Sequence, residues 1–271
     1  MSQITFAYKA GCPMIQEVSL SVDAGEFIAI AGRNGSGKTT LTKLMMSLIK
    51  PSHGQLTFNG TDTRKYSPAD MARHIGYVFQ NPDRQIFRDT VAAEVAYGPE
   101  QLGFDQERTA AAVRQALAMT GLTGLAEMYP RVLSKGQKQK VAIASALAMQ
   151  PKMLILDEPT SGQDAKERDH LLKLLVELNK QGIAIVLVTH DMEILARYVS
   201  RVVVMSRGVK VFDGTVSQLF AGNDEVNAWG LVAPVAVKIS REMGMLGVDS
   251  SLLVEELASN LSKMARREQH E

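Results

Sequence analysis

A glycine-rich segment at residues 32–39 contains the residue types that bind phosphate groups. It reads Gly-Arg-Asn-Gly-Ser-Gly-Lys-Thr and ends with Lys38 and Thr39. Glycines let the backbone turn tightly enough for successive N–H groups to face a phosphate, and the helix expected next adds the positive end of its dipole. In this pattern the lysine binds the β- and γ-phosphates and the threonine hydroxyl binds Mg²⁺. The segment therefore predicts that the chain binds a nucleoside triphosphate.

Two adjacent carboxylates, Asp157 and Glu158, follow an apolar run at residues 153–156 that is typical of a buried strand. Charged side chains are rare beside a buried strand unless they serve a function. Hydrolysis of a γ-phosphate requires Mg²⁺ and a base next to the attacking water. We expect Asp157 to bind Mg²⁺ and Glu158 to polarise the water. The alternative is a solvated pair at the end of a strand.

His190 follows another apolar run, at residues 183–188, and so falls at the carboxyl end of a second predicted strand. Open α/β sheets bind ligands at the edge where the carboxyl ends of parallel strands meet. A single histidine more often has a structural role, but this placement favours a hydrogen bond from His190 to the γ-phosphate.

Ser134 is a predicted N-cap in front of a helix over 138–149. The free N–H groups and the hydroxyl at such a helix start form a second surface that can bind phosphate. Alone this signal is weak, because capped helices are common.

Hydrophobic periodicity predicts the elements that must position these side chains. Strands are expected at 4–8, 18–22, 27–31, 153–156, 183–188 and 201–205, followed by a hairpin arm at 207–212. Helices are expected at 40–46 and 167–181, and an alanine-rich helical pattern occupies about 80–150. The sequence therefore predicts an α/β fold with an antiparallel β edge, a parallel-sheet core and an inserted helical subdomain.

The composition changes near residue 223, where two amphipathic helices are predicted, with Ile239 and Met243 in the first and Leu257 and Leu261 in the second. We therefore expect a main domain at 1–222 and a small C-terminal helical appendage at 223–271. The appendage carries five Lys or Arg and eight Asp or Glu, which disfavours binding to nucleic acid or to an anionic membrane. It either packs on its own core or forms a dimerisation face.

The bulk composition excludes several classes of protein. The chain has 271 residues, a net charge of +1 and 22 % charged residues, which argues against nucleic acid as a partner. Its single cysteine, Cys12, cannot form an internal disulfide, and its first residues lack the pattern of a secretory signal. Apolar runs such as 183–188 are about a third of the ~18 residues that a membrane span needs. We therefore expect a cytoplasmic chain that does not cross a membrane.

In their types and order, these motifs resemble those of the ATP-binding-cassette (ABC) ATPases, which have a P-loop NTPase fold. The resemblance covers residues 1 to about 220. It relates Tyr8 to the aromatic residue that stacks on adenine, Gly32–Thr39 to the Walker A loop, Gln80 to the Q-loop, Ser134–Gln137 to the signature, Met153–Glu158 to Walker B, Ser161–Asp164 to the D-loop and His190 to the switch histidine.

The resemblance implies a set of site residues. The residues expected to contact ATP are Tyr8, Arg33, Asn34, Gly35, Ser36, Gly37, Lys38, Thr39, Thr40, Ser134, Gly136, Gln137 and Asp164. Catalytic roles are expected for Glu158, His190 and Gln80, and Mg²⁺ would be bound by Thr39, Gln80 and Asp157. The family pattern also implies a head-to-tail pair of ATPase subunits, in which each ATP lies between Walker A of one subunit and the signature of the other.

Two residues depart from the family pattern. Lys135 stands where glycine is usual, and Gln163 stands where leucine is usual. Neither change removes a catalytic group. Lys135 either adds a cation near the γ-phosphate of the site that this signature completes or points to solvent.

The segment after Gln80 is similar to that of energy-coupling-factor transporter ATPases, which energise importers of vitamins and of cobalt or nickel ions. Residues 79–87, 90–99 and 254–257 carry this similarity, and Asn81 and Pro82 are typical of a helix start. It implies a peripheral subunit on the cytoplasmic face of the cell membrane, with a transmembrane scaffold and a substrate-binding membrane subunit as partners. Asp83 is our candidate for the acid that meets scaffold arginines, although a first-turn carboxylate is also favoured by the helix dipole.

Two other functions stay open. One is the ATPase of an ordinary ABC transporter. The other is a soluble ABC ATPase that acts on DNA or ribosomes, although the chain has no basic tail and no second cassette.

Overall fold

The computed structural model describes residues 1–9, 11–220, 226–243 and 252–268. Its strands are β1 Ser2–Lys9, β2 Cys12–Val18, β3 Phe27–Ala31, β4 His53–Gln55, β5 Thr57–Phe58, β6 Thr61–Asp62, β7 Ile75–Val78, β8 Met153–Asp157, β9 Ala184–Val188, β10 Arg201–Ser206 and β11 Val209–Gly214. Its α-helices are α1 Lys38–Met45, α2 Pro68–Ala72, α3 Val91–Gln101, α4 Gln106–Thr120, α5 Lys135–Ala148, α6 Ala165–Lys180, α7 Met192–Tyr198, α8 Val216–Phe220, α9 Val235–Glu242 and α10 Val254–Glu268.

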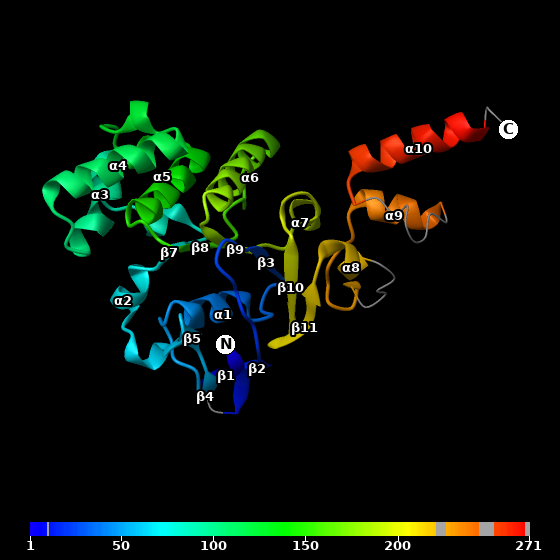
Figure 1. Cartoon of the computed structure of the whole chain (residues 1–271), viewed down its shortest axis with the longest axis horizontal. Helices are drawn as coiled ribbons and strands as arrows, with labels where there is room; N and C mark the ends of the chain where they lie inside the picture. The colour runs from blue at the N-terminus through cyan, green and yellow to red at the C-terminus, as the bar shows by residue number, and fades with distance from the viewer. Residues whose placement is uncertain (10, 221–225, 244–251, 269–271) are drawn as a thin grey trace.

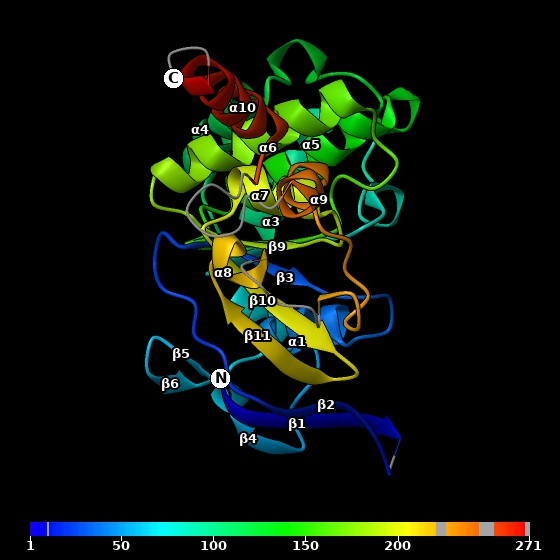
Figure 2. The same cartoon turned by 90° about the vertical axis from the view of Figure 1, so that its right-hand side faces the viewer.

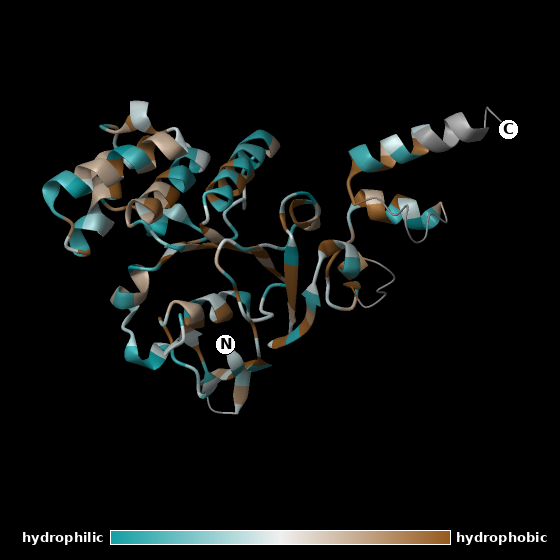
Figure 3. Ribbon diagram, viewed as in Figure 1, coloured by the Kyte–Doolittle hydropathy of each residue, from teal (hydrophilic) through white to brown (hydrophobic). Residues whose placement is uncertain are grey.

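A six-stranded sheet forms the centre of the molecule, in the order β11-β10-β3-β9-β8-β7 (Figure 1). Strands β10, β3, β9, β8 and β7 run parallel, and β11 pairs antiparallel with β10 at one edge. Every residue of β3 and β9 is buried, because both faces of the sheet are covered, as continuous apolar runs in parallel strands require. Figure 3 shows these apolar residues on the central strands and mostly hydrophilic residues on α6. The predicted α/β core is confirmed.

The N-terminal strands form a separate antiparallel sheet in the order β2-β1-β4. Helix α1 lies between this sheet and the central one (Figure 1). One buried cluster joins the three layers, with Ile4 and Ile15 from the small sheet, Leu41 and Leu44 from α1, and Ile30 from β3. The helix that follows the glycine-rich segment is therefore held on both sides.

Helices α3, α4 and α5 form a lobe beside β7, within the range of 80–150 expected for the helical subdomain (Figure 1). Helix α5 joins this lobe to the sheet. A Cβ added at Gly76 of β7 would lie 3.0 Å from the Cβ of Ala146 on α5. Small residues on both elements therefore allow the helix and the strand to pack closely.

The C-terminal part packs against β10 and β11 up to α9, and α10 lies further from the sheet (Figure 1). Val226, Leu231 and Val237 of α9 are buried with Val202 and Val204 of β10. Helices α9 and α10 also contact each other through Ala236 and Leu257 (Figure 1). Of the predicted appendage at 223–271, the residues 223–225, 244–251 and 269–271 lie outside the described residues. Within the described ranges, no helix is both long enough and apolar enough to cross a membrane.

Candidate active site

The glycine-rich segment forms a tight loop between β3 and α1, as predicted. Lys38 is the first residue of α1, and Gly37 caps the helix with a φ of 105° in the left-handed region. The Lys38 Nζ donates hydrogen bonds to the carbonyl oxygens of Gly32, at 2.7 Å, and Arg33, at 3.0 Å. Burial lowers the pKa of Lys38, and the charges of Glu158 and Asp157 oppose this shift. The loop therefore surrounds a desolvated cation.

The loop is packed so closely that only glycine fits at its start. A Cβ added at Gly32 would overlap the carbonyl oxygen of Met205 on β10 and would lie 2.7 Å from the Oγ of Ser36. This Oγ is buried and has no hydrogen-bond partner among the described residues. A buried hydroxyl without a partner is rare in folded proteins, and a phosphate oxygen in the loop is the kind of group that would satisfy it. The loop therefore fits the phosphates of ATP.

Asp157 is buried at the end of β8 beside two hydroxyl groups. The Thr39 Oγ1 donates a hydrogen bond of 2.9 Å to Asp157 Oδ2, and the Tyr77 hydroxyl donates one of 3.3 Å to the same oxygen. Burial raises the pKa of Asp157, although the hydrogen bond from Thr39 opposes this shift. Hydroxyl and carboxylate oxygens are ligands that Mg²⁺ accepts, and Mg²⁺ usually takes its other ligands from phosphates and water. Thr39 and Asp157 therefore fit a Mg²⁺ ion that arrives with the triphosphate.

Glu158 is the point where three segments meet. Its carboxylate accepts hydrogen bonds from Gln80 Nε2, at 3.1 Å, and from Ser161 Oγ, at 3.2 Å. The Nδ1 of His190 lies 3.4 Å from its other oxygen. The backbone of Glu158 has a φ of +47°, which is uncommon for a residue with a side chain. This turn, at the end of β8, directs the carboxylate towards the three partners.

His190 lies at the carboxyl end of β9, as predicted, and its side chain is 61 % exposed. The next residue, Asp191, caps α7 by accepting hydrogen bonds from the N–H groups of Glu193 and Ile194. The imidazole is therefore held on the sheet edge next to Glu158 while most of its surface faces the solvent.

Ser134 is the N-cap of α5, as predicted. Its Oγ accepts the N–H of Gln137 at 3.2 Å, and the Gln137 side chain accepts the N–H of Ser134 at 2.9 Å. This capping box starts α5 at Lys135, so the predicted start at residue 138 was wrong by one turn. The two polar side chains satisfy the first free N–H groups and extend the helix backwards.

Lys135 turns towards its own D-loop. Its Nζ lies so close to Gly162 that a Cβ added there would overlap it. Gly136 packs against the carboxyl group of Glu167 on α6, which a Cβ added at Gly136 would approach to 2.7 Å. The signature and the D-loop of one chain are therefore in direct contact.

The remaining predicted residues have the following places. Tyr8 on β1 is 55 % exposed and packs edge-on against Phe6, with ring centroids 4.8 Å apart. Asp164 caps α6 through the N–H of Glu167. Thr40 is buried inside α1. Arg33, Asn34 and Gly35 lie exposed at the tip of the loop.

The segment after Gln80 is a 3₁₀ turn, Pro82–Arg84, rather than the start of an α-helix, although Asn81 caps it as predicted. The Asp83 carboxylate lies 2.8 Å from Lys138 Nζ on α5. Asp83 and Lys138 line a cavity of about 440 Å³.

The sequence profile of a family described as ABC transporter matches residues 15–161, which include the glycine-rich loop, the signature and the paired carboxylates. This chain belongs to the ABC transporter family. Membership confirms the predicted ABC ATPase fold and the prediction that the chain binds ATP.

Named ABC relatives match most of the chain. The energy-coupling factor transporter ATP-binding protein EcfA2 of Caldanaerobacter subterraneus is 36 % identical to this chain over an alignment of 277 residues. The alignment covers 98 % of this chain and 97 % of EcfA2. CbiO1 from Clostridium perfringens, part of the ABC transporter complex CbiONQ, has a TM-score of 0.77 and 34 % identity over 90 % of this chain and 97 % of CbiO1. The structure of a dimeric ATP-binding cassette bound to ADP and Pi matches with a TM-score of 0.71 and 30 % identity. The match covers 79 % of this chain and 97 % of the cassette's chain.

Some relatives are much longer than this ABC chain. It spans 43 % of an ABC transporter ATP-binding protein of Methanosarcina mazei, with 40 % identity, and 41 % of one from Methanosarcina acetivorans, with 38 % identity.

Two residues of the site were missed by the sequence reasoning. Tyr77 binds Asp157 and Thr42 through its hydroxyl, and Ser161, although placed in the D-loop, was given no role at Glu158. No local pattern marks Tyr77, because it becomes a neighbour of Asp157 only when β7 pairs with β8.

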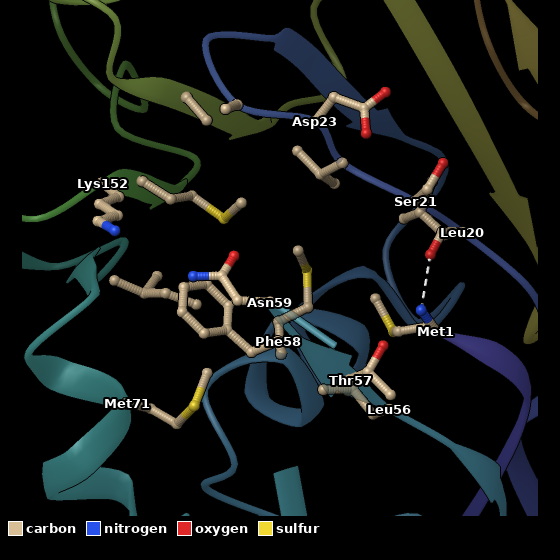
Figure 4. Close-up of a pocket in the computed structure, with 16 residues that line it drawn as sticks. Met1, Leu20, Ser21, Asp23, Leu56, Thr57, Phe58, Asn59, Met71 and Lys152 are labelled. Atoms are coloured by element: carbon tan, nitrogen blue, oxygen red, sulfur yellow. Dashed lines mark hydrogen bonds between the residues drawn. The ribbon is translucent and has the colours of Figure 1, made fainter. Parts of the chain in front are cut away.

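A separate cavity of about 280 Å³ lies at the opposite end of the sheet, near the amino ends of β7, β8 and β9 (Figure 4). Met71, Phe58 and Leu56 line it, with Lys152 and Asp23 among its polar residues. It contains none of the predicted site residues.

Proposed function

We propose that this chain is the ATP-hydrolysing subunit of an energy-coupling-factor importer for a vitamin or for a cobalt or nickel ion. In this proposal it binds the cytoplasmic face of the membrane peripherally. A second ABC ATPase subunit, identical or a paralogue, completes its two ATP sites. Closure of this pair on ATP drives a transmembrane scaffold, which carries a substrate-binding membrane subunit. The similarity to EcfA2 and CbiO1 supports this subtype.

The observation that carries the hydrolysis step is the convergence of Gln80, Ser161 and His190 on the Glu158 carboxylate. A carboxylate held in one orientation can polarise a water molecule and accept its proton as the water attacks the γ-phosphate. His190, with its exposed imidazole, is placed to hydrogen-bond the γ-phosphate. Glu158 is therefore the proposed base and His190 a proposed γ-phosphate ligand.

The phosphate loop supplies binding and charge compensation. Lys38 Nζ donates hydrogen bonds to the carbonyl oxygens of Gly32 and Arg33. When ATP binds, Lys38 would donate to the β- and γ-phosphates instead. Mg²⁺, bound by Thr39 and Asp157 with Gln80 as the third proposed ligand, would neutralise charge that develops on the phosphate oxygens. Tyr8, exposed on β1, is the proposed adenine-stacking residue.

The position of the signature supports a paired arrangement. Ser134 lies at the start of α5 in the helical lobe, whereas the phosphate loop precedes α1 between the two sheets (Figure 1). Each phosphate loop would then need a signature from another subunit. In this arrangement Ser134, Gly136 and Gln137 of one subunit face the ATP that is bound by the phosphate loop of the other, and Asp164 lies beside this ATP. The dimeric cassette bound to ADP and Pi supports this arrangement.

The cavity beside Asp83 supports a docking site for the scaffold. Ile86, Pro130 and Arg131 complete its lining. Because Asp83 already pairs with Lys138, a scaffold arginine would have to replace this lysine as its partner. Docking would therefore release a lysine on the signature helix.

The test is to express the chain with its neighbouring membrane genes and to purify it from detergent-solubilised membranes through a tag on the chain. We expect a membrane scaffold to co-purify and ATP hydrolysis to be lost in Glu158→Gln. Recovery of an active ATPase that never retains a membrane protein would overturn the importer assignment.

A further inference from the structure

The segment at residues 226–231 lies against the phosphate loop from the outside. The Arg33 side chain crosses Gly230 so closely that an added Cβ there would overlap Arg33 Cγ and Cδ and lie 2.7 Å from Nε. Gly230 has a φ of +71°, a conformation that favours glycine. Figure 2 shows this segment, in orange, beside the beginning of α1. The glycine therefore leaves the space that Arg33 occupies.

The segment is anchored to the sheet. Val226 and Leu231 are buried in the cluster that contains the strand residues of β10, and the turn between them is closed by hydrogen bonds from Gly230 N to Asn227 O and from Leu231 N to Val226 O. The ring of Trp229 lies 6.4 Å from that of Phe212 on β11. The position of Gly230 is therefore set by the core and not by the loop that it touches.

Arg33 connects this contact to the interior of the phosphate loop. Its carbonyl oxygen accepts hydrogen bonds from Ser36 N, at 3.1 Å, and from Lys38 Nζ, at 3.0 Å. A cavity of about 250 Å³ otherwise separates the loop tip from Arg207 and Trp229. The contact between Arg33 and Gly230 bridges that space.

We infer that the turn Asn227–Gly230 is a positioning element of the nucleotide site, which holds Arg33 and so keeps the phosphate loop in the curvature that binds the triphosphate. This inference rests on the proposed role of the loop in ATP binding, and it brings residues beyond the 15–161 family match into the site. Gly230 acts through Arg33, whereas the side chain of Glu158 is held by Gln80, Ser161 and His190. The effect of Gly230 therefore falls on ATP affinity rather than on hydrolysis.

The test is Gly230→Ala in the full chain, with ATP affinity measured by calorimetry and with KM and kcat measured for ATP hydrolysis. The new Cβ displaces the Arg33 side chain, and we expect Kd and KM for ATP to rise about fivefold while kcat stays within about twofold. The matched control is Gly121→Ala. Gly121 caps α4 with a φ of +68°, and no atom of the described residues lies within 4 Å of a Cβ added there. This variant therefore carries only the cost of the strained backbone. Its Kd for ATP should equal that of the wild type.

A double variant separates positioning from general destabilisation. Once Arg33→Ala has removed the side chain, adding Gly230→Ala should change the Kd for ATP by less than about twofold, because the clash is gone. The inference is overturned if Gly230→Ala shifts the Kd no more than Gly121→Ala does, or if the two changes act independently. In that case the ATPase proposal stands. If the wild type binds ATP no better than Lys38→Ala does, the proposed function itself fails.

Discussion

Gln80 Nε2 donates a 3.1 Å hydrogen bond to the Glu158 carboxylate across 78 positions of sequence. The pairing of β7 with β8, in which Val78 faces Leu156, brings the two residues together at one edge of the sheet. Gln80 follows β7 and leads into the helical lobe. A movement of that lobe relative to the sheet would therefore change the partners of the proposed base.

Glu158→Gln should separate ATP binding from hydrolysis. The amide cannot accept a proton from water, so we expect the hydrolysis rate to fall by about 10²- to 10⁴-fold, while ATP affinity changes little because the phosphate loop is intact. Phosphate release and size-exclusion chromatography with ATP and Mg²⁺ check this, and the variant should elute as an ATP-dependent dimer. Hydrolysis at the wild-type rate would refute the base assignment.

Lys38→Ala should remove nucleotide binding. The variant loses the charged hydrogen bonds proposed to bind the phosphates, and we expect the Kd for ATP to rise at least ~100-fold. Lys180→Ala is a suitable control, because Lys180 is an exposed partner of Glu177 on α6, away from the loop. Calorimetry with ATP measures both. Equal affinities in the two variants would contradict the proposed site.

Asp213→Asn should reduce stability at neutral pH and much less in acid. Burial would raise the pKa of Asp213, but hydrogen bonds from Arg201 and Lys210 outweigh it and lower the pKa below its ordinary value of 3.8. The stabilisation is therefore present above the unfolded value and is lost as pH falls through the folded one. We expect a loss of about 1 to 2 kcal/mol at pH 7.

Urea unfolding at pH 7 and at acidic pH checks the Asp213 prediction. Glu177→Gln, which removes an exposed pair with Lys180, should cost less than about 0.5 kcal/mol at either pH. A loss for Asp213→Asn that is the same at both pH values would show that the carboxylate charge is not responsible.

Asp83→Asn should weaken binding of the membrane scaffold without unfolding the chain. Asp83 is largely exposed in its pair with Lys138, so the free energy of unfolding should change by less than about 0.5 kcal/mol. Lys138→Gln, in contrast, frees Asp83 for a scaffold arginine and should retain or strengthen binding. Co-purification from membranes measures both variants, and equal losses in the two would argue against an acidic docking residue.

Features that depend only on neighbouring residues could be predicted from short stretches of sequence. The tight loop at 32–39, the N-cap at Ser134 and the strand end at Asp157 and Glu158 were predicted from adjacent residues, and the structure has each of them. The start of α5 and the 3₁₀ turn at Pro82–Arg84 differ from the prediction, because a capping box and a short turn use nearly the same residue signals as a simple helix start.

The order of residues was enough to identify the chemical groups and to predict that strands would place several of them at one sheet edge, because backbone turns and hydrophobic periodicity are local properties. Which of these groups contact one another became known from the fold. Strand order brought Tyr77 to Asp157, and the return of the chain after β11 brought Gly230 to Arg33. Such contacts depend on how distant segments pack to bury their apolar faces, which no short stretch of sequence encodes.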